Sequence, residues 1–294
     1  MHFSKPKIED YKTYKPFLQI DEFTCENLYL NALIWQDIYH HEFAWFDEKT
    51  LVFRLFEGEG YIYSLPLGES FNEALDAIIR LLGENDHLTA SDGARLELLS
   101  QHLPDGYNLI PAEENFDYIY SVKDLAMLSG KKFHQKRNHI SAFTRKYNWR
   151  YESLNENNIN DIFSVAESWA NERSNGGMDE DIECEFRAIN EILPHYAELD
   201  IRGGILYVDK SAVAFAFGSP INDKVFDVTT EKALSDFPGA YAVINNEFAK
   251  HELLGNFDFV NREDDLGLEG LRRAKRSYNP VNILKKYLVE IKKP

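Results

Sequence analysis

The chain has 294 residues, 44% of them apolar, and a formal net charge of −17 at neutral pH. This length allows one large or two ordinary domains with a substantial core, and the acidic balance argues against general nucleic-acid binding. Cys25 and Cys184 are too few and too far apart in sequence for a disulfide framework or a zinc site. Because the sequence also lacks an apolar signal core and a membrane-length apolar run, we expect a soluble, cytoplasmic protein without a metal.

The first half predicts a helix, a three-stranded antiparallel meander, and then helices alternating with short strands. Apolar residues at helical spacing mark the helices, and polar turns separate the strands of the meander. We expect helices at 24–39, 70–82 and 92–99, and strands at 42–46, 51–55, 61–65, 87–90, 107–110 and 118–121.

A basic helix is predicted at 131–147, with Phe133, Ile140 and Phe143 on its buried side. The window 125–151 has no acidic residue, and a second basic island covers 272–293. Two such islands in an acidic chain suit a small anion or one RNA end better than a long duplex, so no DNA is expected. The candidate contacts to a phosphate or tRNA end are Lys136, Arg137 and Asn138, and the alternative is a solvated basic face.

The second half repeats nearly the same order of elements. Strands are expected at 149–154, 205–208, 212–217, 225–230, 257–260 and 281–291, and helices at 159–171, 182–197 and 240–254, with a polar loop at 174–179. The repeat indicates two related domains. We predict an N-terminal domain at 1–130, a basic connecting helix at 131–148 and a C-terminal domain at 149–294.

The segment 261–280, NREDDLGLEGLRRAKRSYNP, begins with acidic residues and ends with cations. This order suits the dipole of a short helix, and Asp264 or Asp265 is suited to capping its first N–H groups. One interpretation is a well-capped amphipathic helix. The other places the acidic turn at the mouth of a functional site.

Three motifs resemble a bacterial family related to the C-terminal catalytic domain of phosphatidylglycerol lysyltransferases. They are KKFHQKRNHISAFTRKY at 131–147, FPGAYAVINNEFA at 237–249 and the segment 261–280. The resemblance implies an α+β fold of two tandem GNAT-like (acyl-CoA N-acyltransferase) domains, as in Fem-type aminoacyl transferases. Each domain would be a mixed, mostly antiparallel sheet flanked by helices, with the donor site in the second and a degenerate first.

The same resemblance implies a coenzyme A or acyl-CoA site. The loop 236–241 would hold the pyrophosphate, with Gly239 letting the backbone come close and the helix N-terminus favouring the anion. An ordinary strand-to-helix turn is the alternative, and Lys275 either faces an anion or snorkels. The cofactor-binding candidates are Phe226, Val228, Thr230, Phe237, Gly239, Ala240, Tyr241, Arg272 and Lys275.

Aminolysis of an ester or thioester needs a neutral amine, so a carboxylate near the acceptor is suited to act as general base. Glu263, Asp265 and Glu231 are the candidates, and Tyr278 would protonate the leaving group, as the resemblance implies. The alternatives are helix capping with ion pairs to Arg272 for the acids, and a packed, hydrogen-bonded side chain for Tyr278.

These observations predict transfer of an acyl or aminoacyl group from coenzyme A or aminoacyl-tRNA to an amine or hydroxyl acceptor. Transfer would proceed by direct attack in a ternary complex, with the site between the two halves. Two alternatives stay open: a non-catalytic protein that binds coenzyme A or a nucleotide, and a module that binds an RNA end. Peripheral contact with a membrane is also left open.

Overall fold

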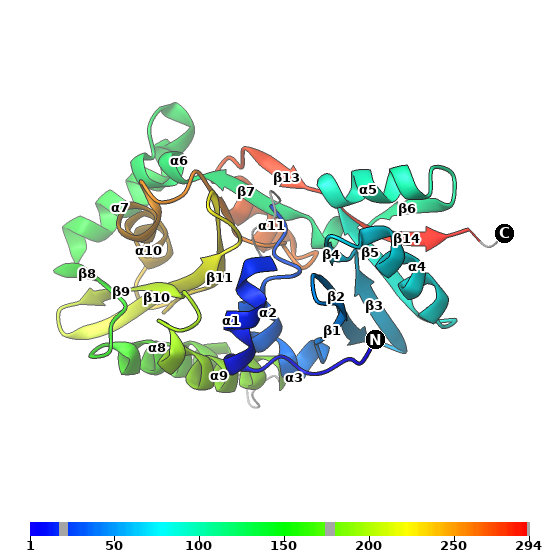
Figure 1. Cartoon of the computed structure of the whole chain (residues 1–294). Helices are drawn as coiled ribbons and strands as arrows, with labels where there is room; N and C mark the ends of the chain where they lie inside the picture. Colours follow the sequence, from blue (N-terminus) through cyan, green and yellow to red (C-terminus); the bar gives the residue numbers. More distant parts are fainter. Residues whose placement is uncertain (18–22, 174–179, 293–294) are drawn as a thin grey trace.

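The structure is a computed structural model that describes residues 1–17, 23–173 and 180–292, so the loop expected at 174–179 lies outside the described residues. Two seven-stranded sheets lie side by side (Figure 1). The first consists of β1 (Glu42–Asp47), β2 (Thr50–Glu57), β3 (Gly60–Ser64), β4 (Leu67–Gly68), β5 (His87–Ser91), β6 (Tyr107–Pro111) and β14 (Lys286–Ile291). The second consists of β7 (Asp117–Ser121), β8 (Trp149–Ser153), β9 (Arg202–Val208), β10 (Ser211–Pro220), β11 (Val225–Ala233), β12 (Phe259–Asn261) and β13 (Asn282–Leu284).

Helices cover both sheets and fill the region between them (Figure 1). They are α1 (Tyr11–Tyr14), α2 (Tyr29–Ile34), α3 (Gln36–Tyr39), α4 (Phe71–Leu81), α5 (Ala94–His102), α6 (Val122–Met127), α7 (His134–Lys146), α8 (Ile159–Arg173), α9 (Glu180–Ile192), α10 (Ala240–Phe248) and α11 (Glu269–Arg276). Three expected elements are divided: 24–39 breaks at Trp35, 240–254 ends in a π-helical turn, and 281–291 forms two strands.

The two sheets exchange their last strands. In the first sheet the order is β1-β2-β3-β5-β14-β6, so the C-terminal strand β14 lies between β5 and β6. In the second sheet the order is β13-β7-β12-β11-β10-β9-β8, so β7 of the first half lies between β13 and β12. The sheets therefore do not follow the predicted boundaries at 130 and 148, because β7 precedes residue 130 and β14 ends the chain.

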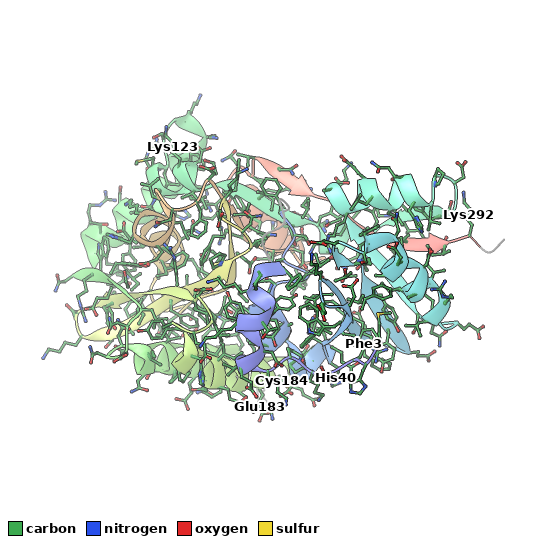
Figure 2. All side chains as sticks on the ribbon, viewed as in Figure 1. Phe3, His40, Lys123, Glu183, Cys184 and Lys292 are labelled. Carbon is green, nitrogen blue, oxygen red and sulfur yellow. The ribbon has the colours of Figure 1, made fainter. Side chains whose placement is uncertain are left out.

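Hydrophobic packing also joins the halves. One core cluster contains Tyr14 and Tyr29 near the N-terminus together with Ile162 of α8 and Phe215 of β10. A second cluster lies on the other face of the second sheet, against α6, α7 and α10, and a third lies between the first sheet and α4 and α5. Side chains fill the space between the sheets, while Lys123 lies at the top of the view and Lys292 at its right (Figure 2).

Each sheet contains one parallel pair of strands that separates after a few residues. In the second sheet β11 and β12 pair from Val225 opposite Phe259 to Asp227 opposite Asn261, and β11 then continues to Ala233 paired with β10 on its other side. In the first sheet β3 and β5 pair in parallel from Ile62 opposite His87 to Ser64 opposite Thr89. Within the described residues, no helix is long and apolar enough to cross a lipid bilayer.

Candidate functional site

The separation of β11 and β12 gathers five polar or aromatic side chains, which we call the β11–β12 fork: Lys136, Glu231, Asn245, Arg262 and Tyr278. Glu231 comes from β11, Asn245 from α10, Arg262 from the end of β12, Tyr278 from the residues after α11, and Lys136 from α7. These side chains are connected by the hydrogen bonds, ring contacts and charge interactions described below. The fork unites two predicted catalytic residues, Glu231 and Tyr278, with one predicted substrate contact, Lys136.

A change of register in β11 directs Glu231 into the fork. The pairing of β10 with β11 shifts between Phe217 and Ser219, so Thr230 lies opposite Phe217 and Glu231 opposite Ala216. Cross-strand partners share a face, and Ala216 belongs to the core cluster beneath α10, whereas Phe217 belongs to the cluster on the other face. Strict alternation would place Thr230 with Phe226 and Val228, but the bulge turns it to the opposite face.

A buried ion pair forms the centre of the fork. Arg262 Nη2 lies 2.9 Å from Glu231 Oε1, and Asn245 Nδ2 donates to Glu231 Oε2 at 3.0 Å. The side chains of Arg262 and Glu231 are 12% and 11% exposed, so solvent screens this pair weakly. Among the described residues, neither Arg262 Nη1 nor Asn245 Oδ1 has a hydrogen-bond partner, and both atoms are buried. The fork therefore retains one unused donor and one unused acceptor.

Lys136 and Tyr278 stack beside this pair. Lys136 Nζ lies 3.6 Å from the centroid of the Tyr278 ring, and the guanidinium of Arg262 lies 5.0 Å from the same centroid. Burial, together with the charge of Arg262, lowers the pKa of Lys136 to about 8. Burial raises the pKa of Tyr278, so its hydroxyl is a weaker acid than that of an exposed tyrosine.

Glu263 and Asp265, the predicted catalytic acids of the segment 261–280, both lie outside the fork. Asp265 is 2% exposed and accepts two hydrogen bonds from Arg272, at 2.8 and 3.0 Å, and one from Tyr118. The hydrogen bonds from Arg272 lower the pKa of Asp265 to about 2, so this carboxylate is a weak base near neutral pH. This geometry matches the helix-capping interpretation of Asp265. Arg272, a predicted cofactor contact, is paired with this carboxylate.

Glu263 and Lys275 face the protein interior. Glu263 has a left-handed backbone, with φ of 57°, and its side chain accepts a hydrogen bond from Asn31 Nδ2 at 2.8 Å. Burial raises its pKa, and the charge of Asp227 adds to the effect. Lys275 Nζ donates to the backbone carbonyls of Arg262 and Asp264, and burial lowers its pKa. Both side chains thus fix the chain around Arg262.

Helix α7 covers the loop that was predicted to hold a pyrophosphate. Gly239 has a φ of 99°, and a Cβ at this position would lie 3.1 Å from the carbonyl oxygen of His139. The Ala240 N–H donates to the carbonyl of Phe237, whose ring lies 5.5 Å from that of Tyr147. Tyr241 is 41% exposed and accepts a hydrogen bond from Trp169. The space that the missing side chain of Gly239 leaves is therefore occupied by α7.

The remaining predicted substrate contacts lie outside the fork. Arg137 donates to the carbonyls of Leu128 and Gly130, which follow the end of α6, and Asn138 pairs with His134 on an exposed turn. Arg137 thus stabilises the carbonyl end of a helix and the residues that follow it.

Sequence reasoning missed Arg262 and Asn245. Both had a signal: Arg262 is the one cation among the acids of NREDD, and Asn245-Asn246 interrupts the apolar sequence of α10. Amides in an otherwise apolar helix need hydrogen-bond partners when they are buried. Asn246 finds them in the carbonyls of Leu125 and Ala126, and Asn245 finds one in Glu231.

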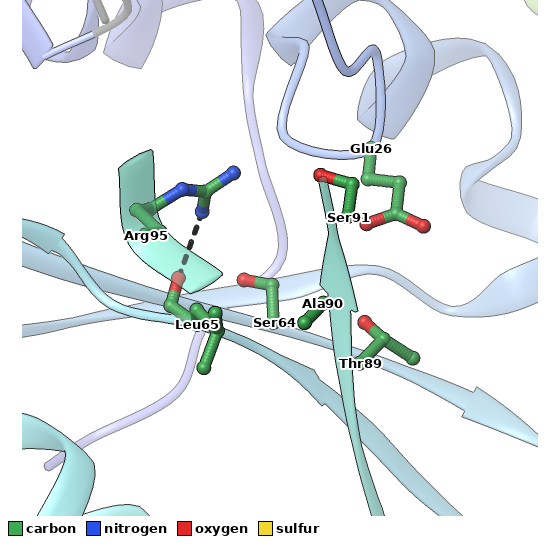
Figure 3. Close-up of a pocket in the computed structure, with 7 residues that line it drawn as sticks. All are labelled: Glu26, Ser64, Leu65, Thr89, Ala90, Ser91 and Arg95. Carbon is green, nitrogen blue, oxygen red and sulfur yellow. Dashed lines mark hydrogen bonds between the residues drawn. The ribbon is translucent and has the colours of Figure 1, made fainter. Parts of the chain in front are cut away.

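The first sheet has a corresponding separation of β3 and β5, where Ser64, Thr89 and Arg95 line a small pocket (Figure 3). Arg95 Nη1 donates to the carbonyl of Leu65 at 2.9 Å. When the Asn27 amide is turned so that both of its atoms have partners, its oxygen accepts from Arg95 and its nitrogen donates to Ser64. Because residues before α2 fill this position, the first sheet has no counterpart of the fork among the described residues.

Comparisons with known proteins agree with this architecture. The family model described as phosphatidylglycerol lysyltransferase, C-terminal, matches residues 17–290. A solved structure of a conserved protein of unknown function from Bacteroides thetaiotaomicron is 34% identical over 99% of both chains, with a TM-score of 0.88. An uncharacterized protein of Mycoplasmoides gallisepticum is 24% identical over 61% of this chain, which spans 57% of that protein's length.

Two more distant structures share the fold. The C-terminal domain of a putative lysylphosphatidylglycerol synthetase from Agrobacterium fabrum is 14% identical over 96% of this chain and 91% of its own, with a TM-score of 0.67. FemX is 9% identical over 97% of both chains, with a TM-score of 0.56. The predicted α+β fold of two tandem GNAT-like domains is thereby confirmed. The chain belongs to the family of phosphatidylglycerol lysyltransferase C-terminal domains.

Proposed function

We propose that the chain transfers an acyl or aminoacyl group from an ester or thioester donor to an amine or hydroxyl acceptor at the β11–β12 fork. The observation that supports this most is the buried Glu231–Arg262 pair, with an unused N–H group on Arg262 and Lys136 beside it. Membership of a lysyltransferase family makes group transfer the reaction class to test. We infer direct attack without a covalent enzyme intermediate.

The charges of the fork suit the steps of such a transfer. Attack by a neutral amine forms a bond to the carbonyl carbon and places negative charge on the carbonyl oxygen, which Arg262 Nη1 is available to stabilise. Glu231, which holds the guanidinium in place, is the carboxylate at the fork and accepts the proton that the amine loses.

Collapse of the tetrahedral intermediate breaks the bond to the leaving group, which then needs a proton. Lys136, with a pKa of about 8, is mostly protonated at neutral pH and is a stronger acid than Tyr278. We therefore assign this proton to Lys136 in place of Tyr278. The Tyr278 ring holds the ammonium through a cation–π contact.

For the donor, the structure supports an aminoacyl ester better than coenzyme A. The loop 236–241 is covered by α7 at Gly239, and the Ala240 N–H already has an acceptor. Arg272 and Lys275, the predicted phosphate contacts, bind Asp265 and backbone carbonyls. These residues do not fit a pyrophosphate cradle, which argues against coenzyme A as the donor. We propose aminoacyl-tRNA as the donor.

The test compares turnover with aminoacyl-tRNA and with acetyl-CoA, using amine and hydroxyl acceptors, in the full chain and two variants. Arg262→Lys should lower kcat about 100-fold, because a buried donor to the oxyanion is displaced. Arg273→Lys, on an exposed side chain of α11, should leave kcat within about twofold. Binding of acetyl-CoA without turnover would support the alternative of a non-catalytic protein that binds coenzyme A or a nucleotide. Equal binding of charged and uncharged tRNA without turnover would support the RNA-end module.

A further inference from the structure

A second polar cluster lies beneath the fork, on the side of β11 that faces α2. Cys25, Asp227 and Glu263 place one possible ligand atom each within 4.8 Å of one another. They come from the segment before α2, from β11 and from the residues after β12, so they are distant in sequence. Cys25 is 5% exposed and Asp227 is fully buried.

One oxygen of this cluster has no partner. Thr229 Oγ1 donates to Asp227 Oδ2 at 2.7 Å, but Asp227 Oδ1 is buried and accepts no hydrogen bond from any described residue. A buried carboxylate oxygen without a donor is costly, and such groups are normally paired with a cation or a metal. The unused oxygen therefore points to a bound cation.

The charges of Lys286 and Lys275 act on Asp227 and Glu263, but both ammonium groups are bonded to other groups. Lys286 Nζ lies 2.8 Å from Asp117 Oδ1, and Lys275 donates to two backbone carbonyls. Within the described part of the chain, neither Asp227 nor Glu263 has a salt bridge within 4.0 Å. Two neighbouring carboxyl groups and a thiol thus share this site, and among the described residues no lysine or arginine nitrogen forms an ion pair with either carboxyl group.

We propose that Cys25, Asp227 and Glu263 bind a divalent transition metal, for which Zn²⁺ fits the donor set best. A thiolate with two carboxylates suits a borderline metal and leaves a fourth tetrahedral position for water. Cys25 Sγ lies 3.4 Å from Asp117 Oδ2, and burial raises the pKa of Asp227 to about 7 and raises that of Glu263. Metal binding would therefore release to solvent the proton of the Cys25 thiol and any proton held by these two carboxyl groups.

Hydrogen bonds from neighbouring side chains already orient two of the three ligands. Asn31 Nδ2 donates to Glu263 at 2.8 Å, and Thr229 Oγ1, which donates its single proton to Asp227, lies 2.9 Å from Asn31 Oδ1. Such contacts to ligands are a regular feature of metal sites. The metal would join the N-terminal segment to the second sheet, and Glu263 adjoins Arg262 of the fork.

The test uses the full chain, stripped with a chelator and then dialysed against Zn²⁺, Mn²⁺ or Mg²⁺ separately. We expect about one equivalent of Zn²⁺ to survive desalting, with a melting temperature several degrees above that of the stripped protein. Cys25→Ser and Asp227→Asn should each weaken Zn²⁺ binding at least about tenfold. Cys184→Ser is the matched control, because Cys184 is also buried but belongs to α9.

Two readouts do not depend on the folding of the variants. With Co²⁺ the unmodified chain should show a sulfur-to-cobalt charge-transfer band, and Zn²⁺ should slow alkylation of Cys25 but not of Cys184. Absence of retained metal for all three cations, or unchanged alkylation of Cys25 with Zn²⁺ present, would overturn the proposal. Equal Zn²⁺ retention by the folded Cys25→Ser and Asp227→Asn variants would overturn the ligand assignment.

Discussion

At the scale of single residues, the ionisable groups around Arg262 differ in the physical cause of their pKa shifts. Lys136 is shifted to about 8 mainly by burial, with the repulsion of Arg262 in support. Asp265 is shifted to about 2 mainly by hydrogen bonds from Arg272. The first shift leaves a group that exchanges a proton near neutral pH, and the second leaves a permanently charged structural carboxylate.

Lys136→Met should raise stability at neutral pH by about 1 kcal/mol, after allowance for partial solvent screening of the ammonium. The folded pKa of Lys136 lies below its unfolded value, so between about pH 8 and pH 10 the unfolded state binds more protons. Burial of the Lys136 ammonium therefore destabilises the folded protein below about pH 8, and this destabilisation is lost as the pH rises from about 8 to about 10. Urea unfolding at several pH values should therefore show the advantage of the variant shrinking; a constant difference would contradict the assignment.

The same residue should shape the pH dependence of transfer. If protonated Lys136 delivers the proton to the leaving group, kcat falls as the pH rises through about 8. Lys136→Arg should remove this limb of the profile, because a guanidinium stays protonated. The measurement is kcat against pH for both proteins, and a limb that persists in the variant would exclude Lys136 as its source.

Asp265→Asn should act on stability and leave chemistry unchanged. The variant loses the two-hydrogen-bond ion pair with Arg272 at a 2% exposed site, which should cost about 2 kcal/mol in urea unfolding. Glu269→Gln is a suitable control, since its pair with Arg273 is exposed and 3.8 Å long. A large loss of kcat in folded Asp265→Asn would restore the general-base role predicted for Asp265.

At the scale of elements, the start of α10 depends on its contact with α7. Gly239 combines a positive φ with a backbone carbonyl 3.1 Å from the position of a Cβ, whereas Gly255 has a φ of 85° and open space around it. Both positions need glycine for their conformation, but only Gly239 also needs it for packing.

Gly239→Ala should therefore destabilise the protein by about 2 kcal/mol, and Gly255→Ala by about 1 kcal/mol. The difference between the two values, measured by urea unfolding, isolates the contact between α7 and the loop. If the two variants lose equal stability, α7 does not press on Gly239, and the loop regains room for a phosphate.

At the scale of the whole molecule, the strand exchange makes each sheet depend on both ends of the chain. β14 pairs with β5 on one side and β6 on the other, and its Lys286 pairs with Asp117 of β7. Removing β14 would leave two strand edges of the first sheet without partners and a buried carboxylate without its cation.

We expect fragments 1–130 and 131–294, expressed separately, to lack a cooperative unfolding transition. Each fragment would contain the strand that belongs to the other sheet and would lack its own. Co-expression should restore folding, because the two fragments together supply β7 and β14 to their partner sheets. Cooperative unfolding of either fragment alone, followed by circular dichroism, would contradict this dependence.

Periodicity and motifs determined much of this protein before its tertiary structure was considered. The spacing of apolar residues predicted the meander at 42–65 and helix α4, because side-chain burial with period 2 or 3.6 is a local property of the chain. The repeated order of elements and the three motifs predicted the tandem fold. Glu231, Tyr278 and Lys136 were predicted for separate roles, and the structure places their side chains in one fork.

Only the tertiary structure decided which strands pair and which charges meet. The exchanged strands β7 and β14 pair with strands more than 130 residues away in the sequence, and no local pattern encodes such a pairing. The bulge in β11 directs Glu231 toward Arg262, whereas Asp265 pairs with Arg272 of the helix that follows it. Two similar carboxylates therefore have different surroundings. Local sequence sets the shape of each element, whereas burial and long-range partners set the chemistry of its ionisable groups.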